Sequence, residues 1–127
     1  MEKEKKLGQA ELEIMQAIWA SGEPCSSSFI LSQLKDSLDW KLPTLMTSLA
    51  RLVDKGYLQC DKSGRVNMYS PLISERDYKA QASTSFLRRM YNNSLREMIS
   101  TLYNGSALSE QDITELRDFL DQMESKK

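Results

Sequence analysis

The chain has 127 residues, of which 40% are hydrophobic and 28% charged, with a formal net charge of −1. This length supports one compact domain or two small modules, and the composition is typical of a folded, largely helical protein. No apolar run approaches the length of a membrane span and no secretion signal is recognisable, so we expect a cytoplasmic protein that does not span or bind a membrane.

The sequence contains two cysteines, Cys25 and Cys60, and no histidine. The absence of histidine excludes a Ser-His-Asp triad, and the two cysteines do not form the closely spaced pair typical of zinc sites. We therefore predict no catalytic residue, no metal site and no cofactor, and we expect that the chain is not an enzyme. Each cysteine is interpreted as a small, half-buried hydrophobic residue.

Two helices are predicted after a charged, frayed start at residues 1–6. The first covers Gln9 to Ala20 and stops at Ser21-Gly22, a typical helix end. The second covers about Ser27 to Ser37, after a serine run that suits a helix start. Their apolar positions follow the helical period, with Leu12, Met15, Ile18 and Trp19 on the first helix and Ile30, Leu34 and Leu38 on the second.

A third helix is predicted from Pro43 to Lys55, after a turn at residues 39–41 and before a stop at Gly56. At about 100° per residue, its side chains separate into two faces. One face is apolar and is expected to be anchored in the core, whereas the other is polar and is offered to a partner. The apolar face holds Leu45, Leu49, Leu52 and Val53, and the polar face holds Thr44, Thr47, Ser48, Arg51 and Lys55.

The period changes after Gly56, where two short strands are predicted on either side of a turn at residues 61–64. Three helices followed by a hairpin are typical of a winged helix-turn-helix, in which the third helix enters the major groove of DNA. Charge supports this reading locally, because residues 40–67 hold two acidic side chains, Asp54 and Asp61, against five basic ones. The basic residues are Lys41, Arg51, Lys55, Lys62 and Arg65.

These patterns assign roles to the polar face of the third helix and to the hairpin. Arg51 and Lys55 reach phosphates, and Thr44, Thr47 and Ser48 meet base edges or thymine methyl groups. Lys62 and Arg65 suit phosphate or minor-groove contact. The alternative is an amphipathic helix whose polar side faces only water.

A long helical pattern begins at Ser74, is interrupted at residues 92–94, and is followed by a final amphipathic helix after a loop. About 55 residues cannot enclose a core of their own, so these apolar stripes must fold back on residues 1–72 or pair with a second chain. We favour pairing, because proteins that read duplex DNA commonly use two-fold symmetry. The expected dimerisation residues are Phe86, Leu87, Met90, Tyr91, Leu95, Met98, Leu102, Ile113, Leu116 and Leu120.

Together the patterns predict a mainly α protein with a small β-hairpin. Residues 1–72 would form a winged helix-turn-helix DNA-binding domain, and residues 73–127 a helical dimerisation region. A rival hypothesis is a small helical adaptor that binds another protein through the apolar stripe of residues 86–102.

Four segments, in order, resemble the penicillinase-repressor (BlaI/MecI/CopY) family: LGQAELEIMQAIW, DWKLPTLMTSLARLVDKGYL, GRVNMYSPLISERDY and LSEQDITELRDFL. The resemblance implies a dimeric transcriptional repressor that binds double-stranded operator DNA. It maps the family's DNA contacts to Lys41, Pro43, Thr44, Met46, Thr47 and Arg51. The basic residues often found at the start of the family's third helix are replaced here by Pro43 and Met46.

The resemblance also bears on how the repressor is released. The copper-responsive branch carries Cys-x-Cys motifs near its C-terminus, and no cysteine follows Cys60 here. In the antibiotic-responsive branch, a regulatory protease cuts between Asn and Phe in the dimerisation region. The aligned cleavage position is Thr101-Leu102, so we expect another, unidentified signal.

Overall fold

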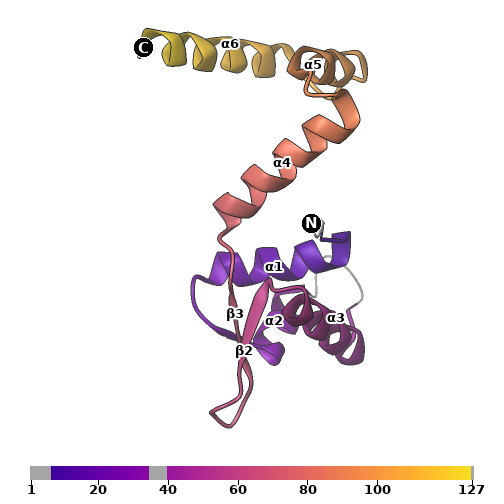
Figure 1. Cartoon of the computed structure of the whole chain (residues 1–127), viewed down its shortest axis with the longest axis vertical. Coiled ribbons are helices and arrows are strands. Elements are labelled where there is room, and N and C mark those ends of the chain that lie inside the picture. Colours follow the sequence, from indigo (N-terminus) through magenta and orange to yellow (C-terminus); the bar gives the residue numbers. More distant parts are fainter. Residues whose placement is uncertain (1–6, 35–39, 127) are drawn as a thin grey trace. The chain divides into compact units, whose positions relative to one another are not determined.

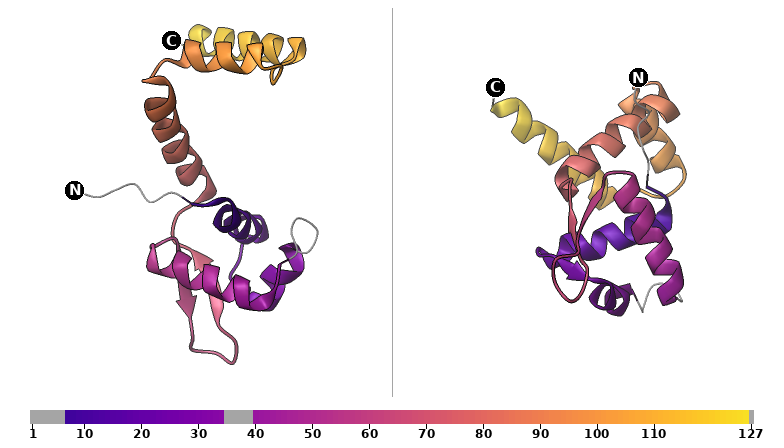
Figure 2. Two further views of the ribbon diagram at one scale, coloured as in Figure 1. Left: turned by 90° about the vertical axis from the view of Figure 1, so that its right-hand side faces the viewer. Right: turned by 60° about the horizontal axis from the view of Figure 1, so that its bottom comes forward.

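The computed structural model describes residues 7–34 and 40–126, which fall into two compact units, Met1–Ala82 and Ser83–Lys127. The predicted frayed start, the end of the second helix and Asp39 in the predicted turn lie outside the described residues. The first unit contains three helices, a small sheet and the start of a fourth helix (Figures 1 and 2). Its elements are α1 (Gln9–Ser21), β1 (Cys25–Ser26), α2 (Ser27–Leu34), α3 (Leu42–Asp54), β2 (Leu58–Asp61), β3 (Met68–Pro71) and the first turns of α4 (Glu75–Tyr91).

The predicted order of three helices and a hairpin is confirmed. The predicted end of α1 is also confirmed, because Gly22 adopts a left-handed conformation with φ of 75° and its N–H donates to the Ile18 carbonyl. This conformation is one that glycine adopts without steric cost. The end of α1 therefore lies where the glycine signal stands in the sequence.

The core of the first unit lies where α1, α2 and α3 pack on one another and on the sheet. Trp19 packs against this core and is half-buried, and its Nε1 donates to the Ile73 carbonyl at 3.0 Å. Tyr78 of α4 packs on Trp19 with a centroid distance of 5.8 Å, which is why the unit extends beyond residue 72. The buried apolar residues are Ile14, Met15, Ile18, Cys25, Ile30, Leu34, Leu45, Leu49, Leu52, Tyr57, Leu58 and Tyr69.

The sheet has three antiparallel strands in the order β1-β3-β2, one more than the hairpin predicted. The additional strand, β1, has two residues, which is too short to produce a visible alternation in the sequence. Cys25 and Cys60 both pair with Tyr69, from opposite sides of β3. Cys25 is buried, Cys60 is half-buried, and neither forms a disulfide.

The second unit contains the rest of α4, α5 (Leu95–Asn104) and α6 (Glu110–Ser125). The predicted interruption after α4 is confirmed: Asn92 and Asn93 have φ of 51° and 68°, and Ser94 then caps α5 by accepting the Glu97 N–H. Asparagine tolerates this left-handed conformation better than most residues. Among the described residues of this unit, Ser85 is buried but no apolar side chain is.

Candidate nucleic-acid interface

The rotation of α3 about its axis is set by its leucines. Leu45, Leu49 and Leu52 are fully buried (0% exposed) in the core of the first unit. Because side chains about 100° apart cannot all face inward, the burial of these three turns the opposite side of the helix to solvent. The exposed residues at and within α3 are Lys41, Leu42, Pro43, Thr44, Met46, Thr47, Ala50, Arg51 and Asp54.

Ser48 does not belong to this exposed surface. It was predicted to meet base edges, but it is only 8% exposed and lies on the buried side of α3. That prediction is wrong because Ser48 is one turn from both Leu45 and Leu52, so the helix face that the core covers is wider than the leucine stripe alone. Ala50 and Leu42 are exposed on α3, and the sequence analysis did not include them because small and apolar residues do not mark a polar face.

The end of α3 is closed by backbone hydrogen bonds around Gly56. The Gly56 N–H donates to the Val53 carbonyl and the Tyr57 N–H to the Leu52 carbonyl, both at 3.0 Å. With Gly56 at φ of 87°, this is a Schellman motif, which confirms the predicted helix stop. The chain then passes directly into β2, so the end of α3 and the start of the hairpin are held together.

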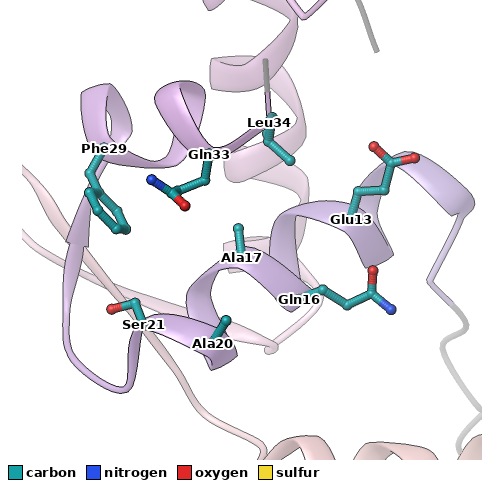
Figure 3. A pocket seen from close by; sticks show the side chains of 8 residues that line it. All are labelled: Glu13, Gln16, Ala17, Ala20, Ser21, Phe29, Gln33 and Leu34. Atoms are coloured by element: carbon teal, nitrogen blue, oxygen red, sulfur yellow. The ribbon is translucent and has the colours of Figure 1, made fainter. Parts of the chain in front are cut away.

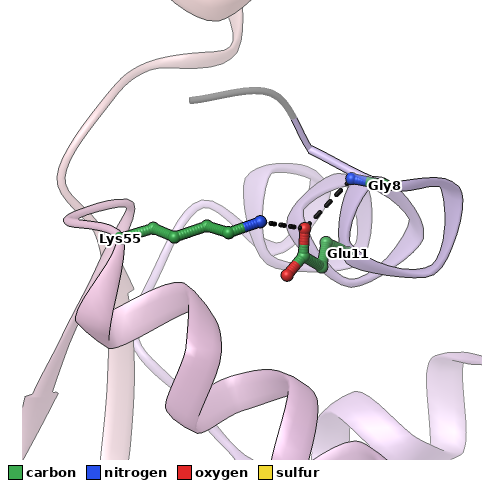
Figure 4. A network of polar contacts seen from close by, with 3 residues as sticks. All are labelled: Gly8, Glu11 and Lys55. Atoms are coloured by element: carbon green, nitrogen blue, oxygen red, sulfur yellow. Dashed lines mark hydrogen bonds and ion pairs between the residues drawn. The ribbon is translucent and has the colours of Figure 1, made fainter. Parts of the chain in front are cut away.

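Lys55 ties the end of α3 to the start of α1 (Figure 4). Its Nζ lies 2.7 Å from Glu11 Oε1, and the Gly8 N–H donates to the same oxygen at 3.0 Å. The Glu11 side chain is 11% exposed and the Lys55 side chain 32%. Lys55 was predicted to reach DNA phosphates, and in the structure its ammonium group pairs with Glu11, which joins the end of α3 to α1.

The electrostatic environment keeps Glu11 ionised. Burial by itself would raise the pKa of the Glu11 carboxyl. The hydrogen bonds from Lys55 and the Gly8 N–H, together with the positive charges of Lys55 and Arg51, outweigh this effect and lower the pKa below its usual value of 4.5. Glu11 is therefore a stable anion opposite the end of α3 at neutral pH.

The hairpin loop between β2 and β3 carries two cations. Lys62 and Arg65 are both exposed, and the loop projects from the rest of the first unit (Figures 1 and 2). The loop begins with a turn in which the Ser63 N–H donates to Asp61 Oδ1 at 2.9 Å. Hydrogen bonds from Ser63 lower the pKa of Asp61. The loop therefore presents two positive charges and one negative charge.

The predicted dimerisation residues all lie on exposed or half-buried positions of α4, α5 and α6. The prediction did not include three further exposed apolar side chains of α5 and α6, which are Tyr103, Phe119 and Met123. Phe86, Met90, Leu95 and Leu120 are exposed, and Leu87, Tyr91, Met98, Leu102, Ile113 and Leu116 are half-buried.

The described residues were also searched for a pocket, a metal site and a membrane-spanning helix. A hollow of about 440 Å³ lies between α1 and α2, where the side chains of Glu13, Gln33 and Phe29 stand around its rim (Figure 3). Across residues 7–34 and 40–126, no group of three His, Cys, Asp or Glu residues is placed to hold a metal ion. None of the helices in this part of the chain is long and apolar enough to cross a membrane.

Known proteins similar in sequence to this chain belong to one family of repressors. The family described as "Penicillinase repressor" matches residues 7–122. The penicillinase repressor of Bacillus licheniformis is 35% identical over 127 residues, covering 100% of this chain and 98% of that protein. The methicillin resistance regulatory protein MecI of Staphylococcus aureus is 28% identical over 115 residues, covering 91% of this chain and 93% of that protein.

Solved structures of a related repressor resemble part of the chain. The solution structure of the DNA-binding domain of the repressor BlaI has a TM-score of 0.52 and 37% sequence identity, and covers 61% of this chain and 94% of that chain. The monomeric form of Bacillus licheniformis BlaI in complex with the blaP half-operator gives a TM-score of 0.51, with the same identity and coverage.

The contact between Glu11 and Lys55 predicts a pH-dependent contribution to stability. Replacing Glu11 by Gln should lower the free energy of unfolding at pH 7 by about 1 kcal/mol, because a charge-assisted hydrogen bond becomes a neutral one. The folded-state pKa of Glu11 lies below the ordinary value of 4.5, so this contribution is present above that pH and is lost as the pH falls through the folded-state pKa.

Urea unfolding of the parent chain and of Glu11→Gln from pH 7 down to pH 3.5 measures this difference. Glu23→Gln, which changes an exposed carboxylate of the same unit, is the control and should match the parent throughout. A deficit of the Glu11→Gln variant that stays constant across this pH range would show that the ionised carboxylate is not its source.

Proposed function

The chain belongs to the penicillinase repressor family, and from this we propose that it acts as a homodimer whose two α3 helices bind neighbouring half-sites of operator DNA. It is a DNA-binding transcriptional repressor and not an enzyme, given its family and its likeness to the BlaI DNA-binding domain. The proposal adds which residues contact DNA and how two chains combine. We also propose that it acts in the cytoplasm, where it can reach chromosomal DNA.

The observation that carries the proposal is the exposed face of α3. A helix of this kind fits the major groove, and its outward side chains then face base edges. Thr44, Met46 and Thr47 lie on the outward side of the first turns, where the recognition helix of a helix-turn-helix meets the bases. Pro43 opens the same helix without leaving an unpaired N–H.

Cations at the edges of this face supply phosphate contacts. Lys41 precedes the first residue of α3, and Arg51 is exposed about two and a half turns further along. Lys62 and Arg65 on the hairpin loop provide a second set of charges from another element. Contacts of this type determine the position of the protein on the duplex and make its affinity depend on salt.

Dimerisation is proposed because the second unit exposes apolar side chains and lacks a buried apolar core in its described residues. Its helices expose large apolar side chains: Phe86 is 43% exposed, Met90 58% and Leu95 54%. A unit of this size without a buried apolar core gains little stability from its own packing. Association with the same helices of a second chain would bury these side chains and bring two α3 helices onto one operator.

Release by cleavage at Thr101-Leu102 would require α5 to open. Both residues lie within the helix, where the Thr101 hydroxyl donates to the Glu97 carbonyl at 3.0 Å and Leu102 is half-buried. Local unfolding must therefore precede any cut at this position. We propose that a signal other than an Asn-Phe-specific protease releases the repressor.

Removing Arg51 should weaken specific and nonspecific DNA binding together, because its contact is with the phosphate backbone. In a dimer, Arg51→Ala removes one such contact from each subunit. The slope of log affinity against log salt should then become shallower by about 2. Fluorescence anisotropy with a labelled duplex over a salt series measures this slope.

Lys79→Ala is the matched control, since Lys79 is an exposed cation outside α3 and the hairpin and pairs with Glu75 at 3.1 Å. It should leave both affinity and slope unchanged. If Arg51→Ala binds DNA as tightly as the parent at every salt concentration, the assignment of α3 as the recognition helix is wrong.

A charge within the apolar surface of the second unit should dissociate the dimer. Phe86→Asp is expected to give monomers at micromolar concentration and to weaken operator binding by about 100-fold or more, because the second half-site contact is no longer intramolecular. Sedimentation equilibrium and the same anisotropy assay report the two effects.

Phe29→Asp provides a close control, because Phe29 is 42% exposed but lies on α2 in the first unit. It should remain dimeric. If the parent chain sediments as a monomer at micromolar concentration, the proposed dimer is wrong, whatever the behaviour of the variants.

A further inference from the structure

The centre of the exposed α3 face is apolar rather than charged. Pro43, Thr47 and Ala50 follow the i, i+4, i+7 spacing of one helical ridge, and Met46 lies beside them with 39% of its surface exposed. The cationic side chains lie elsewhere: Lys41 precedes the helix, and Arg51 is at the edge of this ridge.

The hydroxyl group on this ridge is already engaged. Thr47 Oγ1 donates to the Pro43 carbonyl at 3.1 Å, so its proton is held by the backbone of the preceding turn. Its methyl group and oxygen lone pairs are what it offers to a partner. Ser48, the next hydroxyl in sequence, is buried and offers none.

The ridge also has a limit. Asp54, one turn beyond Ala50, is exposed and carries a carboxylate that phosphates would repel. Contact with DNA is therefore concentrated on the part of the ridge from Pro43 to Ala50. This part presents ring, thioether and methyl carbons, and its other exposed hydroxyl, that of Thr44, lies about 100° around the helix from Pro43, to one side of the ridge.

The major-groove edge of DNA offers one apolar group, the C5-methyl of thymine. We propose that Met46, Thr47 and Ala50 determine sequence specificity by packing against thymine C5-methyl groups in each half-site, while the flanking cations contact phosphates. This inference rests on the proposed entry of α3 into the major groove and adds the chemistry by which the helix distinguishes bases.

The test removes the methyl groups from the DNA. A duplex is first selected with the full-length protein from a randomised pool, and each thymine of a half-site is then replaced in turn by deoxyuridine. Burial of one methyl group accounts for about a fourfold change in affinity. We expect the selected half-site to contain thymine, and deoxyuridine to weaken binding by about fourfold at one or more positions.

Two substitutions at Thr47 separate its methyl group from its hydroxyl. Thr47→Val keeps a methyl group at this position and should retain the preference for thymine over deoxyuridine. Thr47→Ser keeps the hydroxyl and should lose the preference at one position. Met46→Ala should lose it at a different position, whereas Leu72→Ala, which shortens an exposed leucine outside α3, should keep every preference.

The outcomes distinguish this inference from the proposed function. If a selected duplex is bound specifically but deoxyuridine is tolerated at every position, the methyl contacts are absent and the proposed function stands. If Thr47→Val loses the preference and Thr47→Ser keeps it, the hydroxyl reads the base and the inference is overturned. If selection yields no preferred duplex, the proposed function fails and the inference fails with it.

Discussion

Burial of the α3 leucines is the constraint on which the surface of the first unit depends. Leu45, Leu49 and Leu52 are fully buried, and each contributes roughly 1.5–3 kcal/mol relative to an exposed side chain. Turning α3 by one residue, about 100°, would expose this stripe, so the core permits one rotation of the helix. The residues proposed to contact DNA are those that this rotation leaves exposed. Lys55, bonded to Glu11, and the backbone bonds around Gly56 then hold the end of the helix in place.

The second unit differs from the first because, among its described residues, no apolar side chain is buried in a core. Its helices begin and end at well-defined local signals, such as Ser94 on α5 and Ser109 on α6, whose side chains accept backbone N–H groups. Local signals define helices but do not bury Phe86 or Leu95. The first unit is therefore stabilised by its own core, whereas the exposed apolar side chains of the second unit form the surface that we propose for dimerisation.

The sequence predicted the helices and the hairpin well, because capping signals and the helical period are local properties of the chain. It missed β1, since two residues contain no periodic signal and their pairing with β3 depends on the tertiary fold. It placed Ser48 and Lys55 on the DNA-binding face because periodicity groups residues by angle alone. How far the core extends around a helix, and whether Glu11 lies within reach of a lysine, are decided by packing between distant segments. The resemblance to a family predicted a DNA contact at Met46, and Ala50 became a candidate only once its exposure was known.

Hydroxyl-radical footprinting of the full-length protein on a selected duplex tests the central claim most directly, because it shows how many α3 helices engage the DNA and on which side. A symmetric pair of recognition helices predicts two protected segments on the same face of the duplex, with centres one helical turn, about 10 base pairs, or a multiple of it apart. Protection of a single segment at saturating protein, or of two segments on opposite faces, would contradict it.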